Sequence, residues 1–134
     1  MKKKISVLFA GLFLVAMLAF VPKTTYQTEW KVPDAAKNKT NPMKGDAASV
    51  AVGKTLYTTH CKSCHGTKGK GDGPKASQLD TESGDFTKAA FQGQTDGSLF
   101  YKTSEGRKDM PSFKKKLPEA DDIWAIVNYM RTLK

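Results

Sequence analysis

The residues most able to do chemistry are concentrated in one short segment, residues 57–76, which reads YTTHCKSCHGTKGKGDGPKA. This segment contains both cysteines and both histidines of the 134-residue sequence. Cys61 and Cys64 are separated by two residues, and His65 follows directly. Three kinds of chemistry use such a pattern: a redox dithiol, half of a metal site, and the attachment of a haem.

The spacing favours attachment of a haem. Cysteines three positions apart on a helical turn present their sulfurs on the same side, roughly 5–6 Å apart at Cβ. Both sulfurs can therefore reach the two vinyl groups of one haem and form thioethers, and the histidine that follows supplies an axial nitrogen to the iron. We predict one covalent haem c, with its iron, attached through Cys61 and Cys64 and ligated by His65 on the proximal side.

The alternative sites fit the sequence less well. A thioredoxin-like dithiol requires a βαβ context, and no strand pattern precedes Cys61. A structural zinc ion needs four ligands, and the extra candidate, His60, is adjacent to Cys61 and hard to direct at the same ion. A disulfide across two residues would close a loop too small to stabilise a fold.

Met110 is the candidate for the sixth position of the iron. It lies in a polar loop beside Pro111, which holds the preceding residue extended. The other methionines lie in the N-terminal leader, in a polar segment and on the apolar face of a helix: Met1, Met17, Met43 and Met130. A thioether favours ferrous iron, so His/Met ligation raises the reduction potential, whereas an open sixth position would admit oxygen or peroxide.

The elements that position these residues are predicted to be helices and loops. A helix over residues 49–65 runs into the motif, with Ser49 or Asp46 as its N-cap. Residues 66–87 are dense in Gly, Asp and Ser, which predicts a loop. The inner face of the helix is predicted to carry Val52, Leu56 and Tyr57.

Two further helices are expected towards the C-terminus. Residues 95–106 predict a short amphipathic helix that ends at Gly106, and residues 107–117 predict a loop. The last helix is predicted to begin with Pro118 at its first position, followed by acidic residues in its first turn. The inward-facing residues of the two helices are predicted to be Leu99, Phe100, Thr103, Ile123, Trp124, Ile126, Val127, Met130 and Leu133.

The N-terminal residues differ in composition from the rest. Three lysines (residues 2–4) precede the uncharged run 5–21, which is the order of a secretory signal, and the run approaches the length of a membrane span. We predict that residues 1–21 are a signal peptide or an N-terminal membrane anchor. The protein is therefore expected to be exported to the periplasm, either soluble or anchored to the inner membrane.

The next segment, residues 22–47, is polar, rich in lysine and interrupted by proline, so we predict an arm or tether. Trp30 and Pro33 either attach this arm to the domain or face solvent. The haem domain is predicted to be residues 48–134.

A formal net charge of +9 suits acidic protein partners or anionic membranes, and no recognition helix or stacking pattern favours nucleic acid.

The chain resembles a class I cytochrome c of the bacterial mono-haem type, over about residues 48–134. The resemblance is carried by CKSCHG with the later GDGP, by DGSLFYKTSEGR, by MPSF and by DDIWAIVNYMRTL. It implies an all-α fold, the small cytochrome c fold, in which three to five helices and long loops are wrapped around one covalently bound haem.

The resemblance also assigns roles to individual residues. It implies that Met110 is the distal iron ligand and that the carbonyl of Pro74 accepts a hydrogen bond from the outer nitrogen of the haem-histidine. It further implies that the first and last helices of the domain cross closely, which a glycine would permit. The residues expected at that crossing are Gly53, Tyr57, Ile126 and Tyr129.

The function implied is that of a one-electron carrier of a respiratory chain, not an enzyme. Its partners would be redox proteins with acidic docking surfaces, because many lysines lie in sequence around the haem-bearing loops. One alternative is a haem enzyme or gas- or peroxide-binding sensor in which Met110 is displaceable. Another is a fixed cytochrome subunit of a membrane redox complex, with membrane association through residues 5–21.

Overall fold

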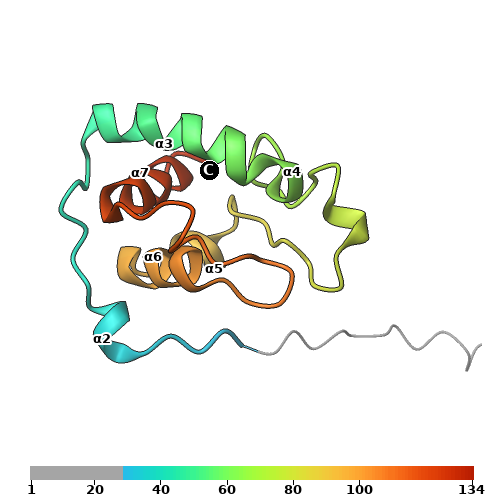
Figure 1. The fold of residues 1–134 in the computed structure, drawn as a ribbon, viewed down its shortest axis with the longest axis horizontal. Helices are drawn as coiled ribbons and strands as arrows, with labels where there is room; N and C mark the ends of the chain where they lie inside the picture. Colours follow the sequence, from blue (N-terminus) through green and yellow to red (C-terminus); the bar gives the residue numbers. More distant parts are fainter. Residues whose placement is uncertain (1–28) are drawn as a thin grey trace, which may run out of the picture.

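The computed structural model describes residues 29–134, so the predicted leader lies outside the described residues. The described part is built of helices and loops without a strand (Figure 1), which confirms the all-α prediction. Its elements are α2 (Asp34–Lys37), α3 (Ala47–His60), α4 (Lys62–His65), the 3₁₀ helix η1 (Ala76–Gln78), α5 (Ala89–Gln92), α6 (Asp96–Glu105) and α7 (Ala120–Met130). These are more helices than the three to five expected, because α2, α4 and α5 are single turns of 4 residues each.

The centre of the fold is the crossing of α3 and α7, which lie against each other in Figure 1. A Cβ atom at Gly53 would overlap the carbonyl oxygen of Ala125, so only glycine lets the two backbones approach this closely. Four residues later on α3, the ring of Tyr57 packs against that of Tyr129, with 5.1 Å between the centroids. The crossing implied by the family resemblance is therefore confirmed.

The inner face of α3 differs from the predicted one. Its buried residues are Ser49, Gly53 and Tyr57, spaced four apart, whereas Val52 is 49% exposed. The prediction for Val52 was wrong because the contact with α7 is centred on Gly53, and a residue one position earlier points away from it. The N-cap is Asp46, whose carboxylate accepts hydrogen bonds from the amides of Ala48 and Ser49.

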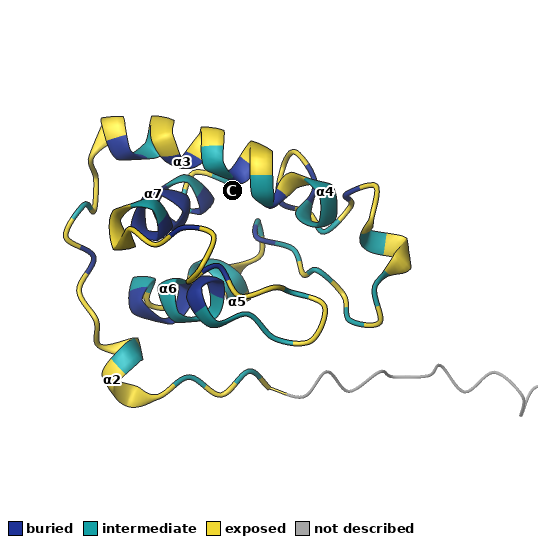
Figure 2. Ribbon diagram, in the orientation of Figure 1, coloured by how far each residue is buried: buried dark blue, intermediate teal, exposed yellow. Residues whose placement is uncertain are grey.

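The predicted helix at residues 95–106 is confirmed. Thr95 caps α6 by accepting a hydrogen bond from the amide of Ser98, and the helix ends at Gly106. Leu99 and Thr103 are buried, and Figure 2 shows the dark inner faces of α6 and α7 turned towards the interior. The ring of Phe100 packs on Trp124, with centroids 4.2 Å apart.

The last helix begins two residues later than predicted. Glu119 is the N-cap of α7, so Pro118 lies before the helix and not in its first turn. The cause is the preceding turn, in which the amide of Leu117 donates to the carbonyl of Phe113 and both side chains are buried. The expected apolar face is otherwise present, since α7 buries Ile123, Trp124, Ala125, Ile126, Val127, Asn128 and Met130.

Residues 29–41, which we call the strap, lie along α6 (Figure 1). The strap contains α2, a helix that the sequence did not predict. The hydroxyl of Thr95 donates to the carbonyl of Lys37 over 2.8 Å, and the ammonium group of Lys39 lies 3.9 Å from the ring centroid of Phe100. A Cβ atom at Gly97 would overlap the carbonyl oxygen of Ala36. The strap is therefore in close contact with the domain.

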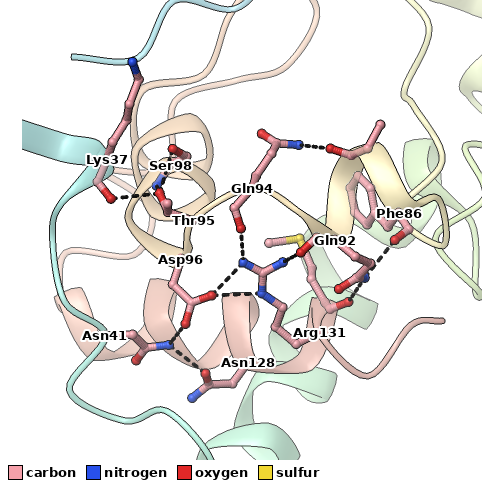
Figure 3. A network of polar contacts seen from close by, with 12 residues as sticks. Lys37, Asn41, Phe86, Gln92, Gln94, Thr95, Asp96, Ser98, Asn128 and Arg131 are labelled. Carbon is pink, nitrogen blue, oxygen red and sulfur yellow. Dashed lines mark hydrogen bonds and ion pairs between the residues drawn. The ribbon is translucent and has the colours of Figure 1, made fainter. Parts of the chain in front are cut away.

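A polar network joins the strap to α6 and α7 (Figure 3). The guanidinium of Arg131 donates to the carboxylate of Asp96 over 2.7 Å and to the carbonyl of Gln92 over 2.8 Å. The amide of Asn41 donates to both Asp96 and Asn128, at 3.0 and 2.8 Å.

Among residues 29–134, no helix has the length and apolar character needed to cross a bilayer.

Candidate functional site

One cavity of about 330 Å³ brings the predicted ligands together. Cys61, Cys64, His65 and Met110 all line it, although Met110 comes from a loop far along the chain. Apolar side chains supply much of the remaining wall, among them Leu79, Phe86, Phe91, Leu99 and Met130. The structure therefore brings Met110 and the cysteine motif to one cavity, as the prediction of Met110 as a ligand requires.

The two cysteines are positioned by the end of α3. The amide of Cys61 donates to the carbonyl of Tyr57 over 2.9 Å, and the chain then forms the single turn α4. Both thiols are free, and Cys61 is buried at 9% exposure. Burial, with a smaller contribution from the neighbouring Cys64, raises the pKa of the Cys61 thiol to about 12. Both cysteines thus line the cavity from one short segment.

The imidazole of His65 lies against Phe86, with ring centroids 4.5 Å apart. Burial lowers the pKa of His65, and a backbone contact with Ser83 opposes that shift. The ring is therefore neutral at pH 7, which is the form that binds metals. Within residues 29–134 its Nδ1 atom is buried and finds no hydrogen-bond partner. Such a buried polar atom is costly unless a further group satisfies it.

Pro74 lies beside the motif but does not line the cavity. The amide of Gly73 donates to the carbonyl of Cys64 over 3.2 Å, and that of Lys75 donates to the carbonyl of Ser63 over 2.8 Å. These two bonds fix the backbone on either side of Pro74 against the cysteine turn. The hydrogen bond expected between the Pro74 carbonyl and the outer nitrogen of His65 stays a prediction.

Met110 is held by a tight turn. The amide of Arg107 donates to the carbonyl of Met110 over 2.8 Å, and the amide of Met110 returns a bond to Arg107 over 3.0 Å. Met110 is partly buried and faces the cavity. Met130 lines the same cavity from α7 and is 5% exposed, so the structure offers two thioethers and not one.

The cavity residues that the sequence interpretation missed include one aromatic and two cationic side chains: Trp30 from the strap, Lys102 from α6 and Arg107 from the turn before Met110. Trp30 carried a signal, because a tryptophan in a polar segment either contacts the domain or faces solvent. The structure shows contact, since the guanidinium carbon of Arg107 lies 4.6 Å from the centroid of a Trp30 ring. Lys102 and Arg107 carried no sequence signal that separates them from ordinary surface residues.

A second hollow lies on the outer side of the motif. It is lined by three exposed lysines, Lys62, Lys68 and Lys70, together with Asp72 and Pro74. The cations outnumber the acid, so this surface presents net positive charge beside the cysteine turn. It is suited to contact with anionic groups.

The residues of the cavity fit a haem. Two thiols close in sequence, a neutral imidazole and a thioether line the cavity and could serve as attachment points and axial ligands, and the aromatic and aliphatic walls suit a flat, largely apolar group. Two orphaned polar atoms also belong to cavity-lining residues, Nδ1 of His65 and the hydroxyl of Ser83. No cluster of three or more His, Cys, Asp or Glu that could bind a metal occurs in residues 29–134.

Comparisons with known proteins agree with this site. The family model for Cytochrome c matches residues 50–134. Among solved structures, the KustC0563 c-type cytochrome is 31% identical, with a TM-score of 0.54 and coverage of 61% of this chain and 96% of that chain. A chain of the Kuenenia stuttgartiensis reducing HAO-like protein complex Kustc0457/Kustc0458 is 28% identical, with a TM-score of 0.63. In that case 81% of this chain matches about half, 52%, of the other. No curated protein matches the sequence.

Proposed function

This chain belongs to the cytochrome c family of haem-based electron-transfer proteins, and on that premise we propose that it is a one-electron carrier of a respiratory chain. Its cofactor is a covalent haem c with iron. In this proposal Cys61 and Cys64 form the thioethers, and His65 and Met110 are the axial ligands. The observation that carries the proposal is that these four side chains line one cavity.

The residues of the chain have distinct tasks in this function. The neutral imidazole of His65 donates a nitrogen lone pair, and the thioether of Met110 favours the ferrous state and so a higher reduction potential. The walls around Phe86, Phe91 and Leu99 exclude water from the ligands. When bound, the haem takes up and returns a single electron at its iron.

The lysines beside the motif support docking to acidic redox partners. Lys62, Lys68 and Lys70 are exposed and border one hollow next to the cysteine turn. Such a patch would attract an acidic partner surface and make the rate of association sensitive to salt. Export to the periplasm, as inferred from residues 1–21, would bring the protein to respiratory partners of this kind.

The proposed axial ligand is tested by the visible spectrum of the ferric holoprotein. Sulfur bonded to ferric iron produces a weak near-red band, and we expect this band in the wild type and its loss in Met110→Ala. Met130→Leu is the matched control, because Met130 lines the same cavity and leucine keeps its apolar volume. The control should retain the band.

The opposite results would redirect the assignment. Loss of the band in Met130→Leu and its retention in Met110→Ala would make Met130 the ligand. A covalent haem without the band in the wild type would favour the enzyme or sensor alternative, in which the sixth position binds a substrate or gas. Stoichiometric, rapid binding of carbon monoxide by the reduced protein at neutral pH would support that alternative.

A second role, a fixed subunit of a larger redox complex, is favoured by one comparison. A chain of the Kuenenia stuttgartiensis complex aligns with 81% of this chain at 28% identity. In this role the haem would still pass single electrons, but to a permanent neighbour. Native fractionation separates the two, because a fixed subunit should co-migrate with other proteins, whereas a carrier should be recovered alone.

A further inference from the structure

One end of the haem cavity combines an aromatic ring with two cations. Lys102 and Arg107 both lie over the indole of Trp30, at 5.7 and 4.6 Å from a ring centroid, and all three residues line the cavity. Met110 lines the same cavity, three residues after Arg107. This cationic end is therefore next to the predicted distal ligand.

The ammonium group of Lys102 is partly buried and lies close to a second cation, unlike that of an ordinary surface lysine. Burial lowers the pKa of Lys102, and the nearby charge of Arg107 lowers it further, while Glu29 opposes the shift. Two other acids line the cavity: Glu82, and Asp109, whose carboxylate accepts a hydrogen bond from the amide of Thr81 over 2.9 Å. The two cations thus lie in a partly buried setting that they share with acidic side chains, and charge-assisted hydrogen bonds to carboxylates are strong in such a setting.

The strap holds Trp30 in this position. Its α2 segment is attached to α6 through the Thr95–Lys37 hydrogen bond and the close approach at Gly97. Asn41 continues the attachment to Asp96 and Asn128. The family model matches residues 50–134, and the strap comes before them in the sequence. Trp30 is therefore a cavity residue from outside the part of the chain that matches the family.

We propose that Trp30, Lys102 and Arg107 form the site that holds the propionate carboxylates of the haem. The two carboxylates are the anionic part of an otherwise largely apolar cofactor, and charge-assisted hydrogen bonds from ammonium and guanidinium groups are the strong way to bind them. The indole covers the two cations and limits their contact with water. The strap is thus part of the haem site and not only a tether.

The two cations are also expected to affect the reduction potential of the haem. Positive charge near the haem stabilises the state that has gained an electron, so Lys102 and Arg107 raise the potential. This effect depends on the haem but not on which redox partner the protein serves. It also leaves the iron–sulfur bond untouched, which separates a failure of this inference from a failure of the proposed His/Met ligation.

The experiment measures the midpoint potential of the holoprotein at fixed pH and ionic strength. We expect Lys102→Gln and Arg107→Gln each to lower the potential, whereas Lys102→Arg should keep it near the wild-type value. The matched control is Lys54→Gln, which removes the same charge from an exposed position on α3. Trp30→Ala should also lower the potential, because water would reach the carboxylates, and Trp30→Phe should restore most of it.

Infrared spectra of haem labelled with ¹³C at the propionate carboxyls test the contact itself. The label-sensitive carboxylate bands should change in Lys102→Gln and remain unchanged in Lys54→Gln. The proposal would be overturned if Lys102→Gln moved neither the bands nor the potential more than Lys54→Gln does. Should Arg107→Gln fail to incorporate haem, the Lys102 series decides, since Lys102 is outside the Met110 turn. Retention of the near-red band in every variant shows that the axial ligands are intact.

Discussion

Gly53 and Gly97 each let a long helix approach another segment of backbone closely, but in different surroundings. Gly53 brings α3 against α7, and a Cβ there would overlap a carbonyl of Ala125. Gly97 brings α6 against the strap, and a Cβ there would overlap a carbonyl of Ala36. Ala125 is 1% exposed in the core, whereas α2 contains no buried residue.

The comparison shows that a close backbone contact at a glycine contributes differently to the free energy of unfolding in the two places. At Gly53, moving the backbones apart would separate two helices that carry most of the apolar core. At Gly97, the displaced element is one turn attached mainly by polar contacts, and it can detach while the core stays packed. The first contact therefore determines global stability, and the second determines local order beside the cavity.

The largest effect is expected for Gly53→Ala, which should lower the free energy of unfolding by about 3 kcal/mol, because the overlap with Ala125 forces α3 from α7. Alanine favours a helix by less than about 1 kcal/mol, so propensity does not offset the loss. Denaturant unfolding of the holoprotein measures the change. Gly93→Ala is the control, since its Cβ would meet only the carbonyl oxygen of Ala89 at 3.1 Å, a contact that a shift of a few tenths of an ångström relieves, and it should change stability by less than about 1 kcal/mol.

A smaller effect is expected for Asp96→Asn, which weakens the link between the two regions. Burial alone would raise the pKa of Asp96, but hydrogen bonds from Arg131 and Asn41 outweigh it, and the pKa lies below its ordinary value of 3.8. The carboxylate thus stabilises the fold above that pH, and this contribution is lost as the pH falls through the lowered pKa. The substitution should cost about 2 kcal/mol at pH 7.

Acidification provides the check on Asp96. The difference between wild type and Asp96→Asn should narrow between about pH 4 and the lower pKa of the folded state, in unfolding experiments on the holoprotein. A difference that stayed constant over this range would contradict the ion pair as its source. Asp34→Asn is the control, because the Asp34–Lys37 pair is exposed and its loss should change stability little.

The smallest effect on global stability is expected for Gly97→Ala. The strap should detach locally at a cost of about 1 kcal/mol, because α2 moves away from α6 without disturbing α7. Hydrogen exchange should show faster exchange in residues 34–41 and unchanged protection in α3 and α7. Equal loss of protection throughout the domain would show that the two glycine contacts do not differ as described.

The sequence predicted the elements that have an extended period. α3, α6 and α7 have 10 to 14 residues, enough for apolar spacing and caps to be recognised. The single turns α2 and α5 have no period to detect, and they form because their ends are bonded to other parts of the chain. The turn α4 lies within the predicted helix 49–65, which the structure interrupts at Cys61. Val52 shows the limit within a correct helix, since the inner face depends on where the partner helix crosses.

The residues of the candidate site also fall into two groups, those predictable from local sequence and those brought together only by the fold. Cys61, Cys64 and His65 are recognisable from local spacing, and Met110 from a loop methionine next to a proline. Trp30, Lys102 and Arg107 meet only because the strap folds back over α6, and no spacing rule joins residues so distant in sequence. Long-range polar contacts such as those of Asn41 were likewise beyond prediction, because their partners are set by packing.

The burial of Cys61 bears on the order in which the domain folds and the haem is attached. Its side chain is part of a core cluster to which α7, a helix far later in the sequence, contributes more residues than any other helix. Once that helix has docked, Cys61 is only 9% exposed, which limits the access of an enzyme that would join its sulfur to a vinyl group. We expect thioether formation to precede docking, so that the substrate of the maturation apparatus is a chain in which α7 has not yet packed and not the folded domain.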